Sequence, residues 1–396
     1  MDLDWRTKGF WLPDAATDVA TFAAAGHSLF DGGFTWPLLV ARRSAVEHNL
    51  RTMVAFCARR GLAFAPHVKT TMAPKLIAAQ LDAGAWGVTT ATANQALICR
   101  NLGVPRVLLA NQLLDPTVLR WAARQAQDGF DLLFQVDSRQ GVRAAAGLPL
   151  RVLVELGHPG GRTGCRTVEE LLAVARAVDA APGLTLAGVA AYEGGLPGLE
   201  QVLAFLDGLR GAVAALAGHG LLGPEVVVAT GGSAWFDLVA DRLAGQWLPG
   251  RAVRLVLRSG AYVSHDDGFY RERTPFNRLG GERLRPALEI WAQVLSTPEP
   301  GLAIVGMGKR DVSFDEGLPE PAAVRRADGT VVPAVGMTVT RVNDHHGYLS
   351  TGGVEVEPGD LVRFGISHPC TAFDKWRAIP YIDDDGMVTD VLQTCF

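Results

Sequence analysis

The chain has 396 residues, of which 48% are hydrophobic and 20% charged, and its formal net charge is only −4. This balance excludes a nucleic-acid-binding tail and a basic membrane face, so small molecules are the expected partners. The length suits two domains, or one barrel with an addition.

The first residues carry acidic side chains at positions 2 and 4 and contain no apolar stretch of signal-peptide length. No later stretch reaches the roughly 18 uninterrupted apolar residues of a membrane span. We therefore expect a cytoplasmic protein, in which residues 1–35 form an N-terminal segment that packs on a later β domain.

Between residues 36 and 284, short apolar runs alternate with alanine-rich amphipathic stretches, which predicts parallel strands joined by helices. Glycine ends several of the helical stretches, as a C-terminal cap does. Ser44 and Glu47 have the spacing of a capping box and predict that a helix begins after the first run. The nine runs are LLVA (38–41), LAFAPHV (62–68), WGVTTA (86–91), RVLLAN (106–111), DLLFQV (131–136), RVLVEL (151–156), LAGVAAY (186–192), EVVVAT (225–230) and RLVLRSG (254–260).

Nine runs are one more than a (β/α)8 barrel needs, so either one strand lies outside the barrel or the sheet is open and doubly wound. We interpret residues 38–41 as the outsider, leading in from a second domain. Residues 62–68 then form the first barrel strand, and Lys69 lies at its C-terminal end, where barrel enzymes build their sites. The predicted fold class is α/β, with a (β/α)8 TIM barrel over residues 36–284.

From residue 285 to residue 396 the pattern changes to short strands separated by Pro, Gly and Asp turns, which predicts a mostly antiparallel β domain. Two acidic loops, residues 315–321 and 383–386, have the composition of solvated surface. The expected strands lie within residues 287–295, 302–308, 334–343, 346–366 and 389–396.

Lys69 is the first candidate for chemistry. A lysine half inside a barrel mouth is partly desolvated, which favours the neutral form that attacks carbonyl groups. Position alone does not distinguish it from a surface lysine, and His67 alone fits a packed histidine.

Two glycine-bearing loops, ATGGSAWF (229–236) and RSGAYVSHD (258–266), follow the seventh and eighth strands of the predicted barrel. At this place, barrels most often hold a phosphate with backbone N–H groups. Each loop by itself is also consistent with a plain turn.

Arg162 and Tyr192 also follow predicted strands. Glycines on both sides of Arg162, in ELGHPGGRTGCR (155–166), allow the close approach of a planar anion. A solvated arginine and an ordinary half-buried tyrosine are the alternatives.

His368 and Cys370, in GISHPCTAFDKW (365–376), are two residues apart and together suit zinc. Two ligands are too few for a closed structural site, and a His-x-Cys pair also occurs by chance. The five cysteines are scattered and odd in number, so we expect thiols rather than disulfides.

Together these motifs resemble the D-threonine aldolase and D-serine dehydratase family, in the branch called amino-acid deaminases. The resemblance runs from about residue 30 to 380. It is carried by PHVKTTMAPKL, AGAWGVTTAT, GHPGGRTGC, YEGG, TGGS, RSGAY and HPCTAFDKW. It implies the alanine-racemase-like fold class of pyridoxal-phosphate enzymes, a barrel plus a β domain, acting as a homodimer. Many relatives have KTH where this chain has Lys69, Thr70 and Thr71.

The resemblance also implies roles for particular residues. Lys69 would form the Schiff base with pyridoxal 5'-phosphate and act as a catalytic residue together with Tyr192. Arg162 and Tyr192 would surround the cofactor ring, and His368 and Cys370 would bind Zn²⁺ or another divalent metal. The phosphate would be held by Thr230, Gly231, Gly232, Ser233, Gly260 and Tyr262.

The function implied is dehydration of a D-3-hydroxy amino acid such as D-serine, to a 2-oxo acid and ammonia. Lys69 would remove the α-proton, and the metal would assist loss of the β-hydroxyl as a Lewis acid. An aldolase of the D-threonine type, for a substrate such as a hydroxyaspartate, is the alternative. The dehydratase is favoured because His-x-Cys resembles dehydratases more than aldolases, which tend to carry His-x-Asp there. A non-catalytic carrier of pyridoxal phosphate is a third hypothesis, although a carrier needs neither the metal pair nor the β domain.

Overall fold

The computed structural model describes residues 2–396, and the chain divides into two compact units. The barrel unit comprises Met53–Lys69 and Ala79–Gly260 and contains an eight-stranded parallel sheet. The β unit comprises the chain up to Thr52, Thr70–Ala78 and Ala261–Phe396, and contains a ten-stranded, mostly antiparallel sheet. The predicted fold class, a barrel plus a mostly antiparallel β domain, is confirmed.

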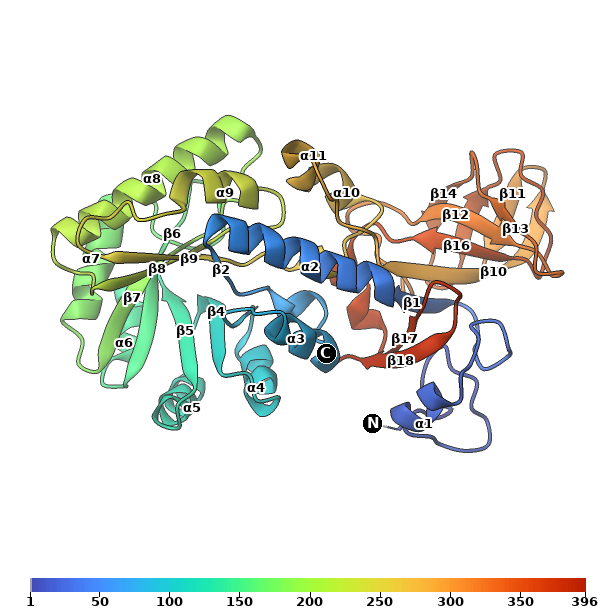
Figure 1. Ribbon diagram of the computed structural model, residues 1–396, viewed down its shortest axis with the longest axis horizontal. Helices are drawn as coiled ribbons and strands as arrows, with labels where there is room; N and C mark the ends of the chain where they lie inside the picture. Colours follow the sequence, from blue (N-terminus) through green and yellow to red (C-terminus); the bar gives the residue numbers. More distant parts are fainter. Residues whose placement is uncertain (1) are drawn as a thin grey trace. The chain divides into compact units, whose positions relative to one another are not determined.

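The parallel strands form a nearly closed barrel, in the order β2-β9-β8-β7-β6-β5-β4-β3 (Figure 1). Between the two end strands, the amide of Thr89 donates to the carbonyl of Pro66 at 2.8 Å, and His67 and Thr89 form an isolated parallel bridge. The strands are β2 (Ala63–Phe64), β3 (Val88–Thr90), β4 (Arg106–Gln112), β5 (Asp131–Val136), β6 (Leu150–Leu156), β7 (Leu184–Ala191), β8 (Glu225–Thr230) and β9 (Ala252–Leu257).

Small and aliphatic side chains pack together in one buried cluster of this sheet, because alternate residues of each strand point to the same face. The cluster comprises Ala65, Leu108, Leu133, Leu153, Ala187, Ala190, Val227, Ala229 and Val256. The barrel is therefore a packed core, and chemistry is confined to its rims.

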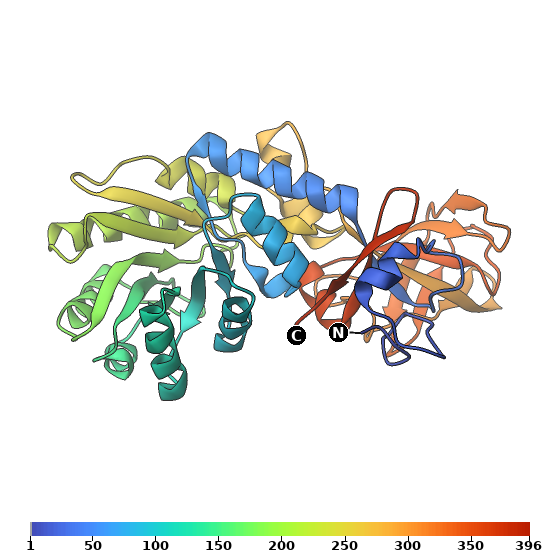
Figure 2. The ribbon, with the colours of Figure 1, turned by 60° about the horizontal axis from the view of Figure 1, so that its bottom comes forward.

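Helices join the strands and lie outside them (Figure 2). Several begin at a side chain that accepts a backbone N–H, as Thr92, Asp115, Ser138 and Thr167 do. The helices that lie between β1 (Leu38–Arg42) and β9 in the chain are α2 (Arg43–Arg60), α3 (Pro74–Asp82), α4 (Ala93–Asn101), α5 (Pro116–Gln127), α6 (Arg139–Ala145), α7 (Val168–Asp179), α8 (Leu199–Gly218) and α9 (Phe236–Leu243).

Helix α8 has the length and apolar composition of a membrane span. One of its faces is nevertheless fully buried in the barrel unit, through Val202, Leu206, Leu209 and Val213. The helix also contacts α9 and β7. It is thus accounted for as a core-facing helix of the barrel.

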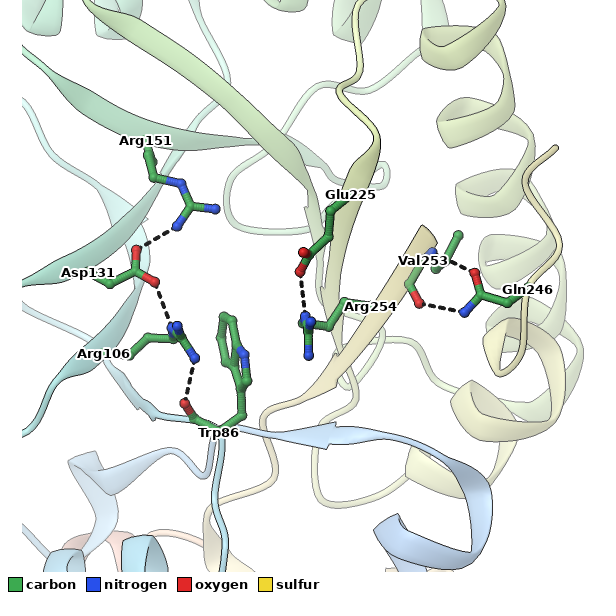
Figure 3. A network of polar contacts seen from close by, with 8 residues as sticks. All are labelled: Trp86, Arg106, Asp131, Arg151, Glu225, Gln246, Val253 and Arg254. Atoms are coloured by element: carbon green, nitrogen blue, oxygen red, sulfur yellow. Dashed lines mark hydrogen bonds and ion pairs between the residues drawn. The ribbon is translucent and has the colours of Figure 1, made fainter. Parts of the chain in front are cut away.

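Charged side chains tie the strands together where they begin (Figure 3). Asp131, at the start of β5, accepts hydrogen bonds from Arg106 Nε on β4 at 2.6 Å and from Arg151 Nη1 on β6 at 2.7 Å. Arg254 Nε on β9 donates to Glu225 Oε1 on β8 at 2.6 Å. This charged rim lies at the amino-terminal ends of the strands, which in barrels contribute to stability rather than to catalysis.

In the β unit, β1 (Leu38–Arg42) pairs with β10 antiparallel and with β17 parallel, so residues 38–41 lie outside the barrel as predicted. The N-terminal helix α1 (Val19–Ala24) packs against β18. The remaining strands are β10 (Leu288–Glu299), β11 (Leu302–Val305), β12 (Glu320–Arg325), β13 (Val331–Pro333), β14 (Thr338–Val342), β15 (Gly347–Ser350), β16 (Leu361–Gly365), β17 (Ala378–Ile382) and β18 (Val388–Gln393). Short helices are α10 (Phe269–Arg273), α11 (Phe276–Leu279), η1 (Val68–Thr70), η2 (Ala261–Val263), η3 (Pro369–Thr371) and η4 (Phe373–Lys375).

Three strands of this unit, β12, β13 and β17, were not predicted, and each contains a proline, which argues against a strand in sequence. The structure places each proline where it disturbs little pairing. Pro321 lies at a register shift of β12, Pro333 lies on the edge strand β13, and Pro380 lies before the residues of β17 that pair with β1.

The predicted capping box of Ser44 and Glu47 is wrong. Helix α2 begins at Arg43, directly after β1, so Ser44 lies inside its first turn. The hydroxyl of Ser44 instead donates to Asp384 Oδ1 at 2.6 Å. No residue separates strand from helix here, and hence no cap position is available.

Candidate active site

Lys69 lies in η1, which begins four residues after the end of the short strand β2, and its side chain is half-buried. Two residues before it, burial and the positive charges of Lys69 and Arg258 hold the pKa of His67 well below its usual range. His67 is therefore neutral, and its buried Nδ1 has no hydrogen-bond partner within residues 2–396. The lysine thus shares this strand end with an uncharged imidazole.

The first glycine loop is organised by Glu193, a fully buried carboxylate one residue after Tyr192. The Thr230 hydroxyl donates to Oε2 at 2.8 Å, the Gly231 amide to the same oxygen at 3.2 Å, and the Gly232 amide to Oε1 at 2.5 Å. Two of the amides expected at the phosphate are therefore bonded to a carboxylate. The motif YEGG, which contains Glu193, supported the family resemblance, but the sequence gave no indication of a role for this glutamate.

The second glycine loop contacts the first. Ser259 Oγ lies within hydrogen-bond distance of the carbonyls of Gly231 and Gly232, at 3.1 and 3.2 Å. Gly260 approaches the first strand so closely that an added Cβ would lie 2.4 Å from the carbonyl oxygen of His67. Only glycine fits here without movement of the backbone, so the second glycine loop packs directly on the residue two before Lys69.

Arg258 is a buried cation at this rim that sequence reasoning did not identify as a site residue. Its Nη2 donates to the carbonyl of Ala191, and its Nε has no partner among the described residues. Burial lowers the pKa of the guanidinium, while the neighbouring carboxylates Glu193 and Glu155 oppose that shift. The barrel rim therefore contains both cations and carboxylates at close quarters.

Arg162 and Tyr192 meet at the exposed side of the rim, where the guanidinium lies 4.6 Å from the centre of the tyrosine ring. Ser233 is half-buried in the first glycine loop. Tyr262 lies buried in η2, in the β unit. The barrel unit thus brings Lys69, Arg162 and Tyr192 to the C-terminal ends of its strands.

His368 and Cys370 lie at the start of η3 in the β unit. Burial lowers the pKa of His368, but the hydrogen bonding and charge of Cys370, aided by Asp315, outweigh it and raise that pKa to about 9. The imidazole and the thiol are therefore electrostatically coupled. All five cysteines are free thiols, as predicted.

Each member of this pair has a further partner. His368 Nδ1 lies 2.8 Å from Asp315 Oδ2, and Cys370 Sγ lies 3.3 Å from the hydroxyl of Thr70, the residue that follows Lys69 in the chain. Asp315 belongs to the loop predicted as solvated surface; that prediction missed its contacts with the 367–371 segment. Within residues 2–396, no group of three or more His, Cys, Asp or Glu side chains is arranged to hold a metal.

Comparison with known proteins decides the family. Residues 42–243, about half of the chain, match the alanine racemase N-terminal domain. The chain belongs to the alanine racemase N-terminal domain family. Residues 287–382 match a second family, the serine dehydratase domain. The predicted resemblance is confirmed in both parts.

Two curated relatives of this alanine-racemase-like chain show the range of its family. D-threonine aldolase of Arthrobacter sp is 27% identical over 372 residues, which cover 90% of each protein. D-threo-3-hydroxyaspartate dehydratase of Delftia sp. strain HT23 is 28% identical over 386 residues, 89% of this chain and 95% of that enzyme. Both names are those of lyases, and the chain is placed among the lyases of the pyridoxal-phosphate family.

Solved structures agree on the fold. D-threonine aldolase of Filomicrobium marinum superimposes with a TM-score of 0.76 at 24% identity, covering 91% of this chain and 95% of that one. A cysteine-to-alanine mutant of D-threo-3-hydroxyaspartate dehydratase, in its metal-free form, gives a TM-score of 0.72 at 26% identity, covering 91% and 97%.

The barrel rim fits the cofactor of this family. A half-buried amine, Lys69, lies beside a neutral imidazole, and the buried Nδ1 of His67 and Nε of Arg258 have no partner among the described residues. The donor set of His368 and Cys370, one nitrogen and one sulfur, fits a divalent metal that keeps open positions.

Proposed function

We propose that the protein is a pyridoxal-phosphate- and metal-dependent dehydratase of D-3-hydroxy amino acids. The products would be a 2-oxo acid and ammonia. The observation that carries the proposal is the His368–Cys370 pair, a nitrogen and a sulfur donor two residues apart at η3, in a chain that also has a half-buried lysine at a barrel rim. A two-ligand metal leaves positions for a substrate hydroxyl, which a dehydratase needs as its leaving group.

Pyridoxal phosphate, when bound, supplies the electron sink for the substrate's α-carbon. Lys69 would hold the cofactor and then accept the α-proton at Nζ. Neutral His67 adds no positive charge beside that amine. Arg162 and Tyr192, already in contact with each other, would orient the cofactor ring, and Tyr192 is the second residue we assign to catalysis.

For the phosphate we propose two groups of residues with different tasks. Ser233, Gly260 and Tyr262 would bind it. Thr230, Gly231 and Gly232 would shape the loop, because Glu193 occupies their hydroxyl and amides. The buried positive charge of Arg258 supports an anion at this rim.

His368 and Cys370 would hold the metal, with Zn²⁺ the expected ion because imidazole and thiolate ligands suit it. A divalent metal at this pair would supply Lewis acidity for loss of the β-hydroxyl. Thr70 would hold the Cys370 sulfur through its hydroxyl.

The decisive experiment measures products from D-serine, D-threonine and D-threo-3-hydroxyaspartate, with cofactor and Zn²⁺ or Mn²⁺ present. A dehydratase releases ammonia and no glycine, whereas an aldolase releases glycine and no ammonia. These products separate the reactions more sharply than carbonyl assays, because cleavage of hydroxyaspartate gives glyoxylate, which is both an aldehyde and a 2-oxo acid. Glycine without ammonia would overturn the proposal.

An aldolase of D-3-hydroxy amino acids is the second candidate. It is supported by the D-threonine aldolase of Arthrobacter sp, which matches this chain about as well as the dehydratase does. No turnover of any of the three substrates would favour the third hypothesis, a carrier of the cofactor.

Lys69→Ala tests the cofactor role independently of turnover. We expect the variant to lose the visible absorbance of the bound cofactor and its covalent retention after borohydride reduction. Lys75→Ala, which removes a lysine of the next helix that pairs with Asp390, is the matched control and should keep both signals. Retention of the covalent cofactor in Lys69→Ala would assign the linkage to another amine.

A further inference from the structure

The imidazole of His368 is fixed by several contacts within the β unit. Its backbone amide donates to Ser313 Oγ at 3.3 Å, and its ring centre lies 5.7 Å from that of Phe269 and 6.0 Å from that of Tyr270. Nδ1 lies 2.8 Å from Asp315 Oδ2. The ring is therefore held in one orientation, and Nε2 is the nitrogen that Asp315 does not engage.

Asp315 is fixed in turn. Its other carboxylate oxygen, Oδ1, accepts a hydrogen bond from the Thr371 hydroxyl at 2.6 Å. The loop that carries it is bonded to the 367–371 segment on both sides. Ser313, two residues before Asp315, accepts from the His368 amide, and Gly317, two residues after it, accepts from Ser367 Oγ at 2.7 Å.

These contacts indicate that Asp315 holds the candidate metal-binding histidine and does not itself bind the metal. Both oxygens of Asp315 are engaged, one by Thr371 and one by His368. A carboxylate that accepts from Nδ1–H fixes the tautomer of the imidazole and leaves the Nε2 lone pair available to a metal. Residues that hold metal-binding histidines in this way determine affinity although they do not touch the ion.

We propose that Asp315 is a positioning residue of the metal site, which holds His368 with its proton on Nδ1 so that Nε2 can bind the ion together with Cys370. Thr371 is the residue that keeps Asp315 in place. The inference rests on the proposed metal pair and adds residues that lie outside the His-x-Cys motif. It also gives the acidic loop at 315–321 a function.

The test is direct titration of the metal-free, full-length protein with Co²⁺, followed by the sulfur-to-cobalt absorption of a thiolate-bound ion. Asp315→Ala should weaken Co²⁺ binding about 10- to 100-fold, as loss of such partners does at other sites. At saturating Co²⁺ the absorption should return to the wild-type intensity, because Cys370 is unchanged. Asp315 is exposed, so its loss should leave the fold intact, and the thermal midpoint of unfolding checks this.

Three further variants sharpen the result. Asp315→Asn retains an oxygen that can accept from Nδ1–H and should lose less affinity than Asp315→Ala. Thr371→Val frees Oδ1 and should fall between the wild type and Asp315→Ala. Glu316→Gln removes the neighbouring negative charge of the same loop and should bind Co²⁺ like the wild type.

The outcomes separate this inference from the proposed function. If His368→Ala and Cys370→Ala abolish Co²⁺ binding but Asp315→Ala binds like the wild type, the metal pair stands and the role of Asp315 is overturned. If the wild type gives no thiolate absorption at any concentration, the metal pair and its positioning residue are both overturned. If Asp315→Ala and Glu316→Gln lose the same amount of Co²⁺ affinity, the loss comes from the change in net charge, and the positioning role of Asp315 is also overturned.

Discussion

Glu193 is the residue on which the shape of the first glycine loop depends. Its carboxylate accepts three hydrogen bonds, from Thr230, Gly231 and Gly232, in a site without solvent exposure. Removing one partner of a buried hydrogen bond leaves the other partners unpaired, which costs more free energy than the bond contributed. The loop therefore has a specific internal support, separate from the groups proposed to bind phosphate.

Glu193→Gln should lower the free energy of unfolding by about 1–3 kcal/mol, because an amide NH₂ would face a backbone N–H donor. Affinity for pyridoxal phosphate should fall as well, since the loop loses its fixed shape. Urea unfolding and cofactor fluorescence titration measure the two effects. Glu200→Gln, at the exposed first turn of α8, is the control. Tighter cofactor binding in Glu193→Gln would show instead that the carboxylate competes with the phosphate.

Asp267 makes the free energy of unfolding depend on pH. Burial raises the pKa of this carboxyl to about 6, and the charges of Glu320 and Glu289 act in the same direction against Arg271. The folded protein therefore takes up a proton that the unfolded chain, with a pKa near 3.8, does not hold between these values. Stability associated with this group is present at low pH and is lost as pH rises through about 6.

Asp267→Asn should consequently raise the free energy of unfolding by about 1–2 kcal/mol at pH 7 and change it little at pH 4. Denaturant unfolding at the two pH values measures this. Asp328→Asn is a control of opposite sign, because the Thr330 amide holds the pKa of Asp328 below its usual value. An equal gain for Asp267→Asn at both pH values would exclude the titration of this carboxyl as the cause.

The barrel strands are joined at their beginnings by ion pairs and at their ends by the loops of the site. At the beginning, Asp131 bridges β4 and β6, and the guanidinium of Arg106 also lies 4.2 Å from the centre of the Trp86 ring (Figure 3). Trp86 packs against the interior cluster of the barrel. This rim closes the barrel opposite the strand ends where Lys69 lies.

Asp131→Ala should lower the free energy of unfolding by about 1–2 kcal/mol, because it breaks two short charge-assisted bonds at a largely buried carboxylate. Steady-state kinetics should be unchanged, since the rim is at the amino-terminal ends of the strands. Asp179→Ala, at the exposed end of α7, should change neither quantity. A fall in kcat with unaltered stability would contradict the assignment of this rim to stability.

At the scale of the whole molecule, removal of the metal should not unfold the protein. The described residues supply only two evident ligands, and the core of each unit consists of apolar side chains. Chelation should therefore abolish the proposed dehydration while leaving the far-UV circular dichroism unchanged. A cooperative loss of secondary structure on chelation would make the site structural rather than catalytic.

The rate at which each cysteine reacts with a thiol reagent should also depend on metal binding. Cys370 and Cys395 are half-buried, whereas Cys57, Cys99 and Cys165 are buried, and burial raises the pKa of Cys57 and Cys165 to about 12. The native metal-free protein should therefore show two fast thiols with a disulfide reagent, and the metal-loaded protein one. Two fast thiols in both forms would exclude Cys370 as a ligand.

The sequence predicted most of the architecture because its signals are local. Apolar runs of four to seven residues marked all eight barrel strands. The count of nine showed one run too many, and the choice of residues 38–41 as the strand outside the barrel is confirmed. The predictions from sequence failed where tertiary contacts outweighed local preferences. The three proline-containing strands were missed, and Ser44 was wrongly predicted to cap a helix. The site residues inferred from motifs stay predictions, for which the assays above are the test.

Sequence by itself determined the alternation of strands and helices, the position of Lys69 after the first barrel strand, and the family, because periodicity and motifs are properties of neighbouring residues. Only the tertiary structure decided that Glu193 holds Gly231 and Gly232, and that Asp315 holds His368. Those partners lie 38, 39 and 53 residues apart, respectively. Hydrogen bonds over such separations depend on which loops the packed strands bring together, and no local pattern records that.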